Sequence, residues 1–279
     1  MKSRERGVPS PAWAETTARE AGRVTGFLRQ CLALAEMELR KLRHDPTEML
    51  TRIIQPVLWL GVFGEVFTRV RAIPTGQLPY LDFMAPGVLA QSVLFIAIFY
   101  GIAVIWERDL GIVHKLLVSP APRVALVLGK ALSAGVRALP QGCMVYLLAW
   151  LLGVKINWQP GALAGVAVAV LLGAAAFSTL SLIAACIVKT RERFMGIGQA
   201  LTMPLFFASN AVYPISIMPG WLKGLAHINP LTYEVDAMRA LMVAGGRSLN
   251  GIGLDFIVLV ATTAALTALA SRLYPNLAH

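Results

Sequence analysis

The chain has 279 residues, of which 57% are hydrophobic and 14% charged, and it carries a formal net charge of +10. Soluble domains have about a quarter of their residues charged, and disordered chains are poor in apolar residues, so this composition excludes both classes. The predicted fold class is an all-α integral membrane protein. Its basic excess is interpreted first as a topology signal, and no bound nucleic acid is needed to explain it.

The N-terminal region precedes the first apolar stretch. Residues 1–25 have no apolar core of the kind a signal peptide needs and are expected to form a flexible cytoplasmic tail. Within 27–44 the apolar residues recur at three- and four-residue spacing, which predicts one face of a helix: Leu28, Cys31, Leu32, Ala35, Leu39 and Leu42. This segment is interpreted as an elbow helix lying in the membrane interface, although an ordinary amphipathic surface helix has the same pattern. Asp45 and Pro46 then indicate the start of a new helix.

Six stretches are apolar enough to cross a membrane, each of about 20 residues. They are 49–67, 83–106, 138–154 (extended backwards towards 124), 156–188, 194–222 and 256–271. With both termini placed in the cytoplasm, the cytoplasmic pieces hold 18 of the 25 Lys and Arg residues and the outer pieces hold six. This asymmetry predicts six spans with both termini inside.

The segment 214–245 is predicted to form a broken, re-entrant helical hairpin before the last span. Pro214 and Pro219 interrupt an apolar run, and Asn229 followed by Pro230 indicates a capped helix start. Irregular backbone at membrane depth must be buried in protein or line a wet cavity. A plain extracellular loop is the alternative interpretation, and the apolar character of the segment favours the hairpin.

The sequence lacks the motifs of several kinds of chemistry. It has no phosphate-binding loop of the GxxxxGK[ST] type, no HExxH, and no His or Cys at metal-ligand spacing. We therefore expect no catalytic residue, no metal and no cofactor on this chain. The predicted spans also lack a deep Asp or Glu, whereas ion-coupled transporters usually place an ionisable residue near the midplane.

The loop 107–123, between the second and third spans, begins with charged residues and ends in Ser-Pro-Ala-Pro-Arg. Its leucine and valine spacing predicts a short amphipathic helix with a stiff exit. Such a helix could act as a lever for a soluble partner, and an ordinary solvated connector is equally compatible with the pattern.

Two motifs carry a family resemblance. The loop pattern E-R-x-x-G-x-x-x-x-L-x-x-x-P is met by Glu107, Arg108, Gly111, Leu116 and Pro120, and the segment 204–239 contains Met-Pro-Gly-Trp and Asn-Pro-Leu-Thr-Tyr. Together they resemble the permeases of ABC type 2 transporters, especially those of daunorubicin resistance and nodulation-factor export. The resemblance covers 26–279, which is then one transmembrane domain.

The resemblance implies an architecture and a function. Two six-span permeases, as a homodimer or heterodimer, would sit in the bacterial cytoplasmic (inner) membrane among its lipids, each on a separate cytoplasmic ABC ATP-binding subunit that holds ATP and Mg. The chain would be a multi-pass permease for export of a hydrophobic or amphipathic substrate, such as a drug, lipid or glycolipid, as in multidrug efflux and antibiotic resistance. It would itself be no enzyme.

The resemblance also implies roles for particular residues. Those expected to couple to the ATPase are Glu107, Arg108, Gly111, Lys115, Leu116, Pro120 and Arg123. Those expected to line the translocation path or the dimer interface, in spans two and five, are Gln91, Ser92, Tyr100, Gln199, Thr202 and Asn210. Those of the extracellular gate hairpin are Tyr213, Pro214, Pro219, Trp221, Asn229, Pro230 and Tyr233. Packing between helices is the competing explanation for each polar residue of the spans.

Two other functions remain as alternatives. One is an ATP-independent secondary transporter or channel, which the missing midplane carboxylates disfavour. The other is an intramembrane enzyme acting on lipid, which the absence of an acid/base pair disfavours.

Overall fold

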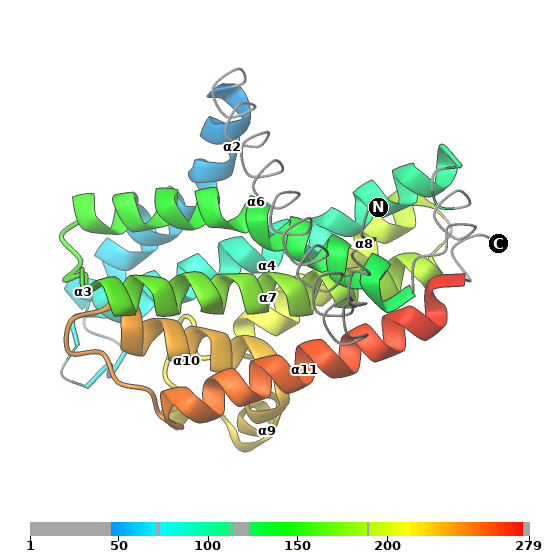
Figure 1. The fold of residues 1–279 in the computed structure, drawn as a ribbon. Coiled ribbons are helices and arrows are strands. Elements are labelled where there is room, and N and C mark those ends of the chain that lie inside the picture. Colours follow the sequence, from blue (N-terminus) through cyan, green and yellow to red (C-terminus); the bar gives the residue numbers. More distant parts are fainter. Residues whose placement is uncertain are drawn as a thin grey trace, which may run out of the picture.

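The computed structural model describes residues 46–70, 73–76, 78–111, 113, 123–188 and 190–275. The predicted tail, the predicted elbow helix (27–44), and the predicted coupling residues Lys115, Leu116 and Pro120 lie outside the described residues. The described part is helical and contains no named strand, which agrees with the predicted all-α class (Figure 1).

The first helical stretch is continuous but irregular. Helix α2 (Pro46–Val57) begins at Pro46, as predicted, and passes into the π-helix η1 (Leu58–Gly64) and then α3 (Glu65–Val70). In Figure 1, α2 rises steeply away from the long helices, which run lengthwise. Because few of its apolar side chains are covered by the rest of the chain, this stretch has an apolar surface available to lipid or to another subunit.

Among the described residues, four helical stretches are long and apolar enough to cross a membrane: Arg52–Val70, Tyr80–Asp109 (α4), Pro160–Ile187 (α7) and Ile252–Leu273 (α11). These match four of the six predicted spans. Helix α6 (Arg123–Leu151) carries Arg137 and Gln141 in its middle, and α8 (Arg191–Phe207) has 17 residues, which is short for a crossing. The remaining two spans therefore stay predictions.

Helix α4 lies at the centre of the bundle and packs against α6, α7, α8 and α10. Small residues along α4 and α7 allow this close packing. Gly87 of α4 lies so close to Ala211 that an added Cβ would be 2.4 Å from the Ala211 carbonyl oxygen. The main apolar core is continuous across α4, α6, α7 and α10.

The apolar run predicted as a fifth span, 194–222, is divided in the structure. Helix α8 ends at Phe207, and a short 3-10 turn η2 (Ile215–Ile217), α9 (Gly220–Ile228) and α10 (Pro230–Met242) follow. Helix α10 packs against α4, α7 and α11, whereas α9 is mostly exposed (Figure 1). The break predicted from the prolines is therefore present, and it begins earlier than the end of the predicted span.

Candidate functional site

The predicted coupling loop leaves the bundle at the end of α4. Glu107 and Arg108 lie in the last turn of that helix, and Gly111 follows with a φ of +71°. The Gly111 N–H donates to the Arg108 carbonyl at 2.9 Å. This left-handed residue ends the helix, which explains why glycine stands there. Arg123, at the other end of the loop, is the first residue of α6.

Four charged residues join the start of this loop to two other helices, and we call them the charged clamp: Glu107, Asp109, Lys130 and Arg191. Glu107 of α4 forms an ion pair with Lys130 of α6. Asp109 of α4 pairs with Arg191 of α8 at 2.7 Å, and the Arg191 guanidinium lies 3.5 Å from the centre of the Trp106 ring. A force applied to the loop would thus act on α4, α6 and α8 together.

Val113 is the one described residue in the interior of the loop. It is fully buried and belongs to an apolar cluster with Val104 of α4, Val127 of α6 and Tyr274 after α11. Val113 is therefore packed at the end of the bundle, in one apolar cluster with residues of α4 and α6, two of the three helices that the charged clamp joins.

The six residues expected to line a pathway do not share one surface. Gln91, Ser92, Thr202 and Asn210 are buried within the chain, and the hydroxyl groups of Ser92 and Thr202 donate to carbonyls one turn earlier in their own helices. Tyr100 is half-buried, and Gln199 is exposed. Only these last two are accessible from outside a single copy.

The predicted gate residues hold the hairpin to the end of α8. Asn229 caps α10 by accepting from the Leu231 N–H at 3.0 Å, as predicted, and its amide donates to the carbonyls of Leu205 at 2.7 Å and Ala208 at 3.2 Å. The Tyr213 hydroxyl donates to the Phe207 carbonyl at 2.5 Å.

The other gate residues lie at the breaks between helices. Pro214 and Pro219 directly precede η2 and α9, Pro230 is the first residue of α10, and the Tyr233 hydroxyl donates to the His227 carbonyl at 2.7 Å. Trp221 is 70% exposed. The hairpin thus presents an aromatic side chain outwards on a frame that is fixed by hydrogen bonds.

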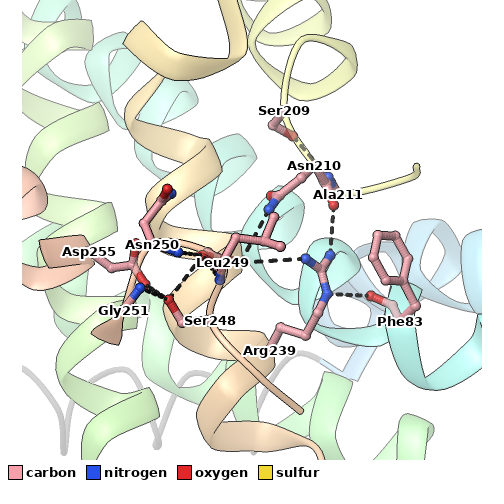
Figure 2. A network of polar contacts seen from close by, with 11 residues as sticks. Phe83, Ser209, Asn210, Ala211, Arg239, Ser248, Leu249, Asn250, Gly251 and Asp255 are labelled. Carbon is pink, nitrogen blue, oxygen red and sulfur yellow. Dashed lines mark hydrogen bonds and ion pairs between the residues drawn. The ribbon is translucent and has the colours of Figure 1, made fainter. Parts of the chain in front are cut away.

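A buried pair of opposite charges, which we call the hairpin ion pair, connects α10 to its surroundings (Figure 2). Asp236 and Arg239 are one turn apart, with 3.9 Å between Oδ1 and Nη1, and both are almost fully buried. Arg239 donates to the carbonyls of Phe83 at 3.2 Å and Asn210 at 2.7 Å, and its guanidinium lies 3.8 Å from the centre of the Phe83 ring. It therefore ties the hairpin to the start of α4 and to the chain after α8.

Asp236 holds the loop that leads into α11. Its Oδ2 accepts from the N–H groups of Leu249 at 2.7 Å and Asn250 at 3.3 Å and from the Ser248 hydroxyl at 3.1 Å (Figure 2). Ser248 also donates to Asp255 in the first turn of α11 at 2.8 Å. Because its hydrogen bonds are made by three separate segments, the hairpin ion pair fixes the geometry of this end of the molecule.

A cavity of about 520 Å³ lies beside the hairpin ion pair. Its lining includes Phe83, Asn210, Pro214, Arg239 and Arg247. The lining combines residues of the hairpin with the start of α4, so a movement of the hairpin would change its shape.

Glu234 is the buried acid that the sequence analysis did not place. Its side chain is fully buried, and neither carboxylate oxygen has a hydrogen-bond partner in the part of the chain that the structure describes. It contacts the middle of α7 at Gly173, where an added Cβ would be 2.1 Å from Glu234 Oε1. In the sequence, the predicted spans have no Asp or Glu near their middle. In the structure, α10 packs the Glu234 carboxylate against the middle of α7.

The sequence predicts no contact for Lys130, Arg191 or Arg239, which enter only the count of basic residues on each side of the membrane. Their neighbours in the fold come from distant segments: Lys130 is 23 residues from Glu107, and Arg191 is 82 residues from Asp109. One local signal was available for the hairpin ion pair, because an Asp and an Arg three residues apart lie on the same helical face.

These features define a helical protein with candidate membrane spans, and the comparisons with known proteins give its family. Residues 29–243 match the ABC-2 type transporter family, and the chain belongs to that family. It is 27% identical to the daunorubicin resistance ABC transporter permease protein DrrB1 of Streptomyces coeruleorubidus, over 96% of this chain and 98% of that protein. It is 23% identical to the inner membrane transport permease YadH of Escherichia coli K12, over 75% of this chain and 82% of that protein.

Proposed function

We propose that this chain is the permease subunit of an ATP-driven exporter in the bacterial inner membrane, with both termini in the cytoplasm. Separate cytoplasmic subunits would bind ATP and Mg, and two permease copies would pass a hydrophobic or amphipathic substrate outwards. The match to DrrB1 along nearly the whole chain favours a drug-like substrate, and lipids or glycolipids have the same amphipathic chemistry.

The charged clamp is the observation that carries this proposal. A permease without its own nucleotide site needs a rigid connection between a cytoplasmic docking element and its membrane helices. The ion pairs Glu107–Lys130 and Asp109–Arg191 supply that connection at the point where the predicted coupling loop begins. Gly111 sets the direction in which the loop leaves α4.

The exposed apolar faces of α8 and of the α2–α3 stretch support pairing of two permease copies. Phe63 of η1 and Phe207 of α8 are both exposed, and they lie in one aromatic group with Trp59 and Phe206, whose ring centres are 5.3 Å apart. Gln199 is exposed on α8 as well. We propose that this combined surface, more than α4, forms the dimer interface, because α4 is enclosed by its own chain.

The experiment is to co-purify the chain with its ATP-binding subunit and measure ATP hydrolysis in lipid nanodiscs. Glu107→Ala and Gly111→Pro should weaken the docking of that subunit or remove stimulation of hydrolysis by substrate. Glu192→Ala, an exposed acid in the first turn of α8, is the matched control and should behave like the unaltered chain. Normal docking and normal stimulation in both Glu107→Ala and Gly111→Pro would contradict the coupling role.

Glu234 favours a second candidate function, an ATP-independent secondary transporter. A buried carboxylate beside the middle of a candidate span is the feature that proton-coupled transporters use. If this is the function, the isolated chain in liposomes should carry substrate in response to a proton gradient, and Glu234→Gln should abolish that transport. If the chain is an ATP-driven permease, the isolated chain should show no such transport.

A further inference from the structure

A second cavity lies between α2, α4 and α6, and it shares no residue with the charged clamp or the hairpin ion pair. Its volume is about 310 Å³. The lining includes two arginines from different helices, Arg52 of α2 and Arg137 of α6. The lining also includes three aromatic rings of α4, those of Phe95, Phe99 and Tyr100.

Arg137 is a cation that lies far from both ends of its helix. It stands at the middle of the 29-residue helix α6, about 21 Å from either end at the usual helical rise. Within a membrane-spanning helix, which α6 is predicted to be, a guanidinium is tolerated when it faces the protein interior, water or an anion, and such residues usually mark a functional pathway. Here it faces the cavity.

Contacts of α6 with α4 and α2 fix the walls of this cavity. The Arg137 guanidinium lies over the Tyr100 ring, 5.2 Å from its centre. Gln141, one turn further along α6, donates to the Arg52 carbonyl at 3.4 Å and so connects α2 to α6. The rings of Phe95 and Phe99 are stacked 6.0 Å apart along the α4 wall.

This combination suits a ligand with an anionic head and an apolar body. The planar fork of a guanidinium matches the oxygens of a phosphate, and stacked phenyl rings offer an apolar surface for a hydrocarbon chain. We propose that the cavity binds the phosphate-bearing head group of an anionic amphiphile through Arg52 and Arg137, with its apolar chain against Phe95 and Phe99. The proposal goes beyond export and does not depend on an ATP-binding subunit.

The test is lipid binding by the purified full chain in detergent, followed by native mass spectrometry. The unaltered chain should retain phosphatidylglycerol in preference to phosphatidylcholine. Arg52→Gln and Arg137→Gln should each weaken binding about tenfold, because each removes charge-assisted hydrogen bonds to the head group. Arg137→Lys should weaken it less, because it keeps the charge, and Arg272→Gln, at an exposed position in the last turn of α11, should leave it unchanged.

Photolabelling of the unaltered chain keeps the proposal testable if a variant fails to fold. Phosphatidylglycerol with a photoreactive acyl chain should label residues 95–99 of α4. Labelling confined to other segments, equal binding of phosphatidylcholine, or full binding by the folded double variant R52Q/R137Q would overturn the proposal.

Two sources can supply this ligand chemistry, a resident phospholipid and a transported amphiphile. The second arm therefore follows fluorescent phosphatidylglycerol between leaflets of proteoliposomes that contain the chain with its ATP-binding subunit. Movement that depends on ATP and is lost in R52Q/R137Q identifies cargo. Retained binding without movement identifies a resident lipid, and both results support the site.

Discussion

The hairpin ion pair provides the sharpest test of the structure, through the substitution Arg239→Met. Asp236 is fully buried and Arg239 is 3% exposed. Removing the guanidinium leaves a buried carboxylate without its counter-charge, and it takes donors away from the carbonyls of Phe83 and Asn210. Removing one partner of a buried charge pair typically costs about 3–5 kcal/mol, and we expect a loss of that size in the free energy of unfolding.

The assay is reversible unfolding in mixed detergent and SDS micelles, followed by circular dichroism. Arg247→Met is the control, because Arg247 is an exposed arginine in the loop that follows α10. It should change the free energy of unfolding by less than about 0.5 kcal/mol. The double variant D236N/R239M should recover at least about 1 kcal/mol relative to R239M, because it removes both charges. If Arg239→Met is as stable as Arg247→Met, the buried pair does not hold the hairpin and the reasoning fails.

Three further predictions use the same unfolding assay. Gly87→Ala should lower the free energy of unfolding by about 1–3 kcal/mol because the added Cβ meets the Ala211 backbone. Gly129→Ala, at a position with open space around it, should not lower it. Asn229→Ala should cost about 2–3 kcal/mol, since a cap and two other hydrogen bonds are lost, while exposed Asn250→Ala should change little. Arg191→Glu should cost under about 1 kcal/mol, because its pair with Asp109 is partly exposed, yet it should reduce substrate-stimulated ATP hydrolysis, and the exchange D109R/R191E should restore it.

Local rules predicted the parts of the fold that local residues determine. The helix starts at Pro46 and Pro230, the Asn229 cap and the breaks at Pro214 and Pro219 all follow from residues within one turn of each boundary. Helix α6 begins at Arg123, which agrees with the predicted extension of the 138–154 stretch backwards towards 124. The end of α8 at Phe207 was missed, because the apolar run continues unchanged into the segment that follows.

The sequence did not predict which distant segments of the chain lie next to one another in the fold. Nothing near Glu234 in the chain indicates that α10 packs against Gly173 of α7, so the burial of this acid could not be predicted from the sequence. The resemblance placed Gln91 and Ser92 on a pathway or dimer interface, with packing between helices as the competing explanation. In the structure α4 is the central helix, and both side chains are buried within the chain. Which helix is central depends on packing among six segments, and hydropathy alone does not contain that information.

The central claim is that the chain moves substrate only when a separate subunit hydrolyses ATP. The most direct measurement is transport of a fluorescent amphiphile in proteoliposomes that contain the chain with or without its ATP-binding subunit. Transport is predicted to require both that subunit and ATP, and to be lost in Glu107→Ala with the complex still inserted. Transport by the chain alone, driven by a proton gradient without ATP, would contradict the claim.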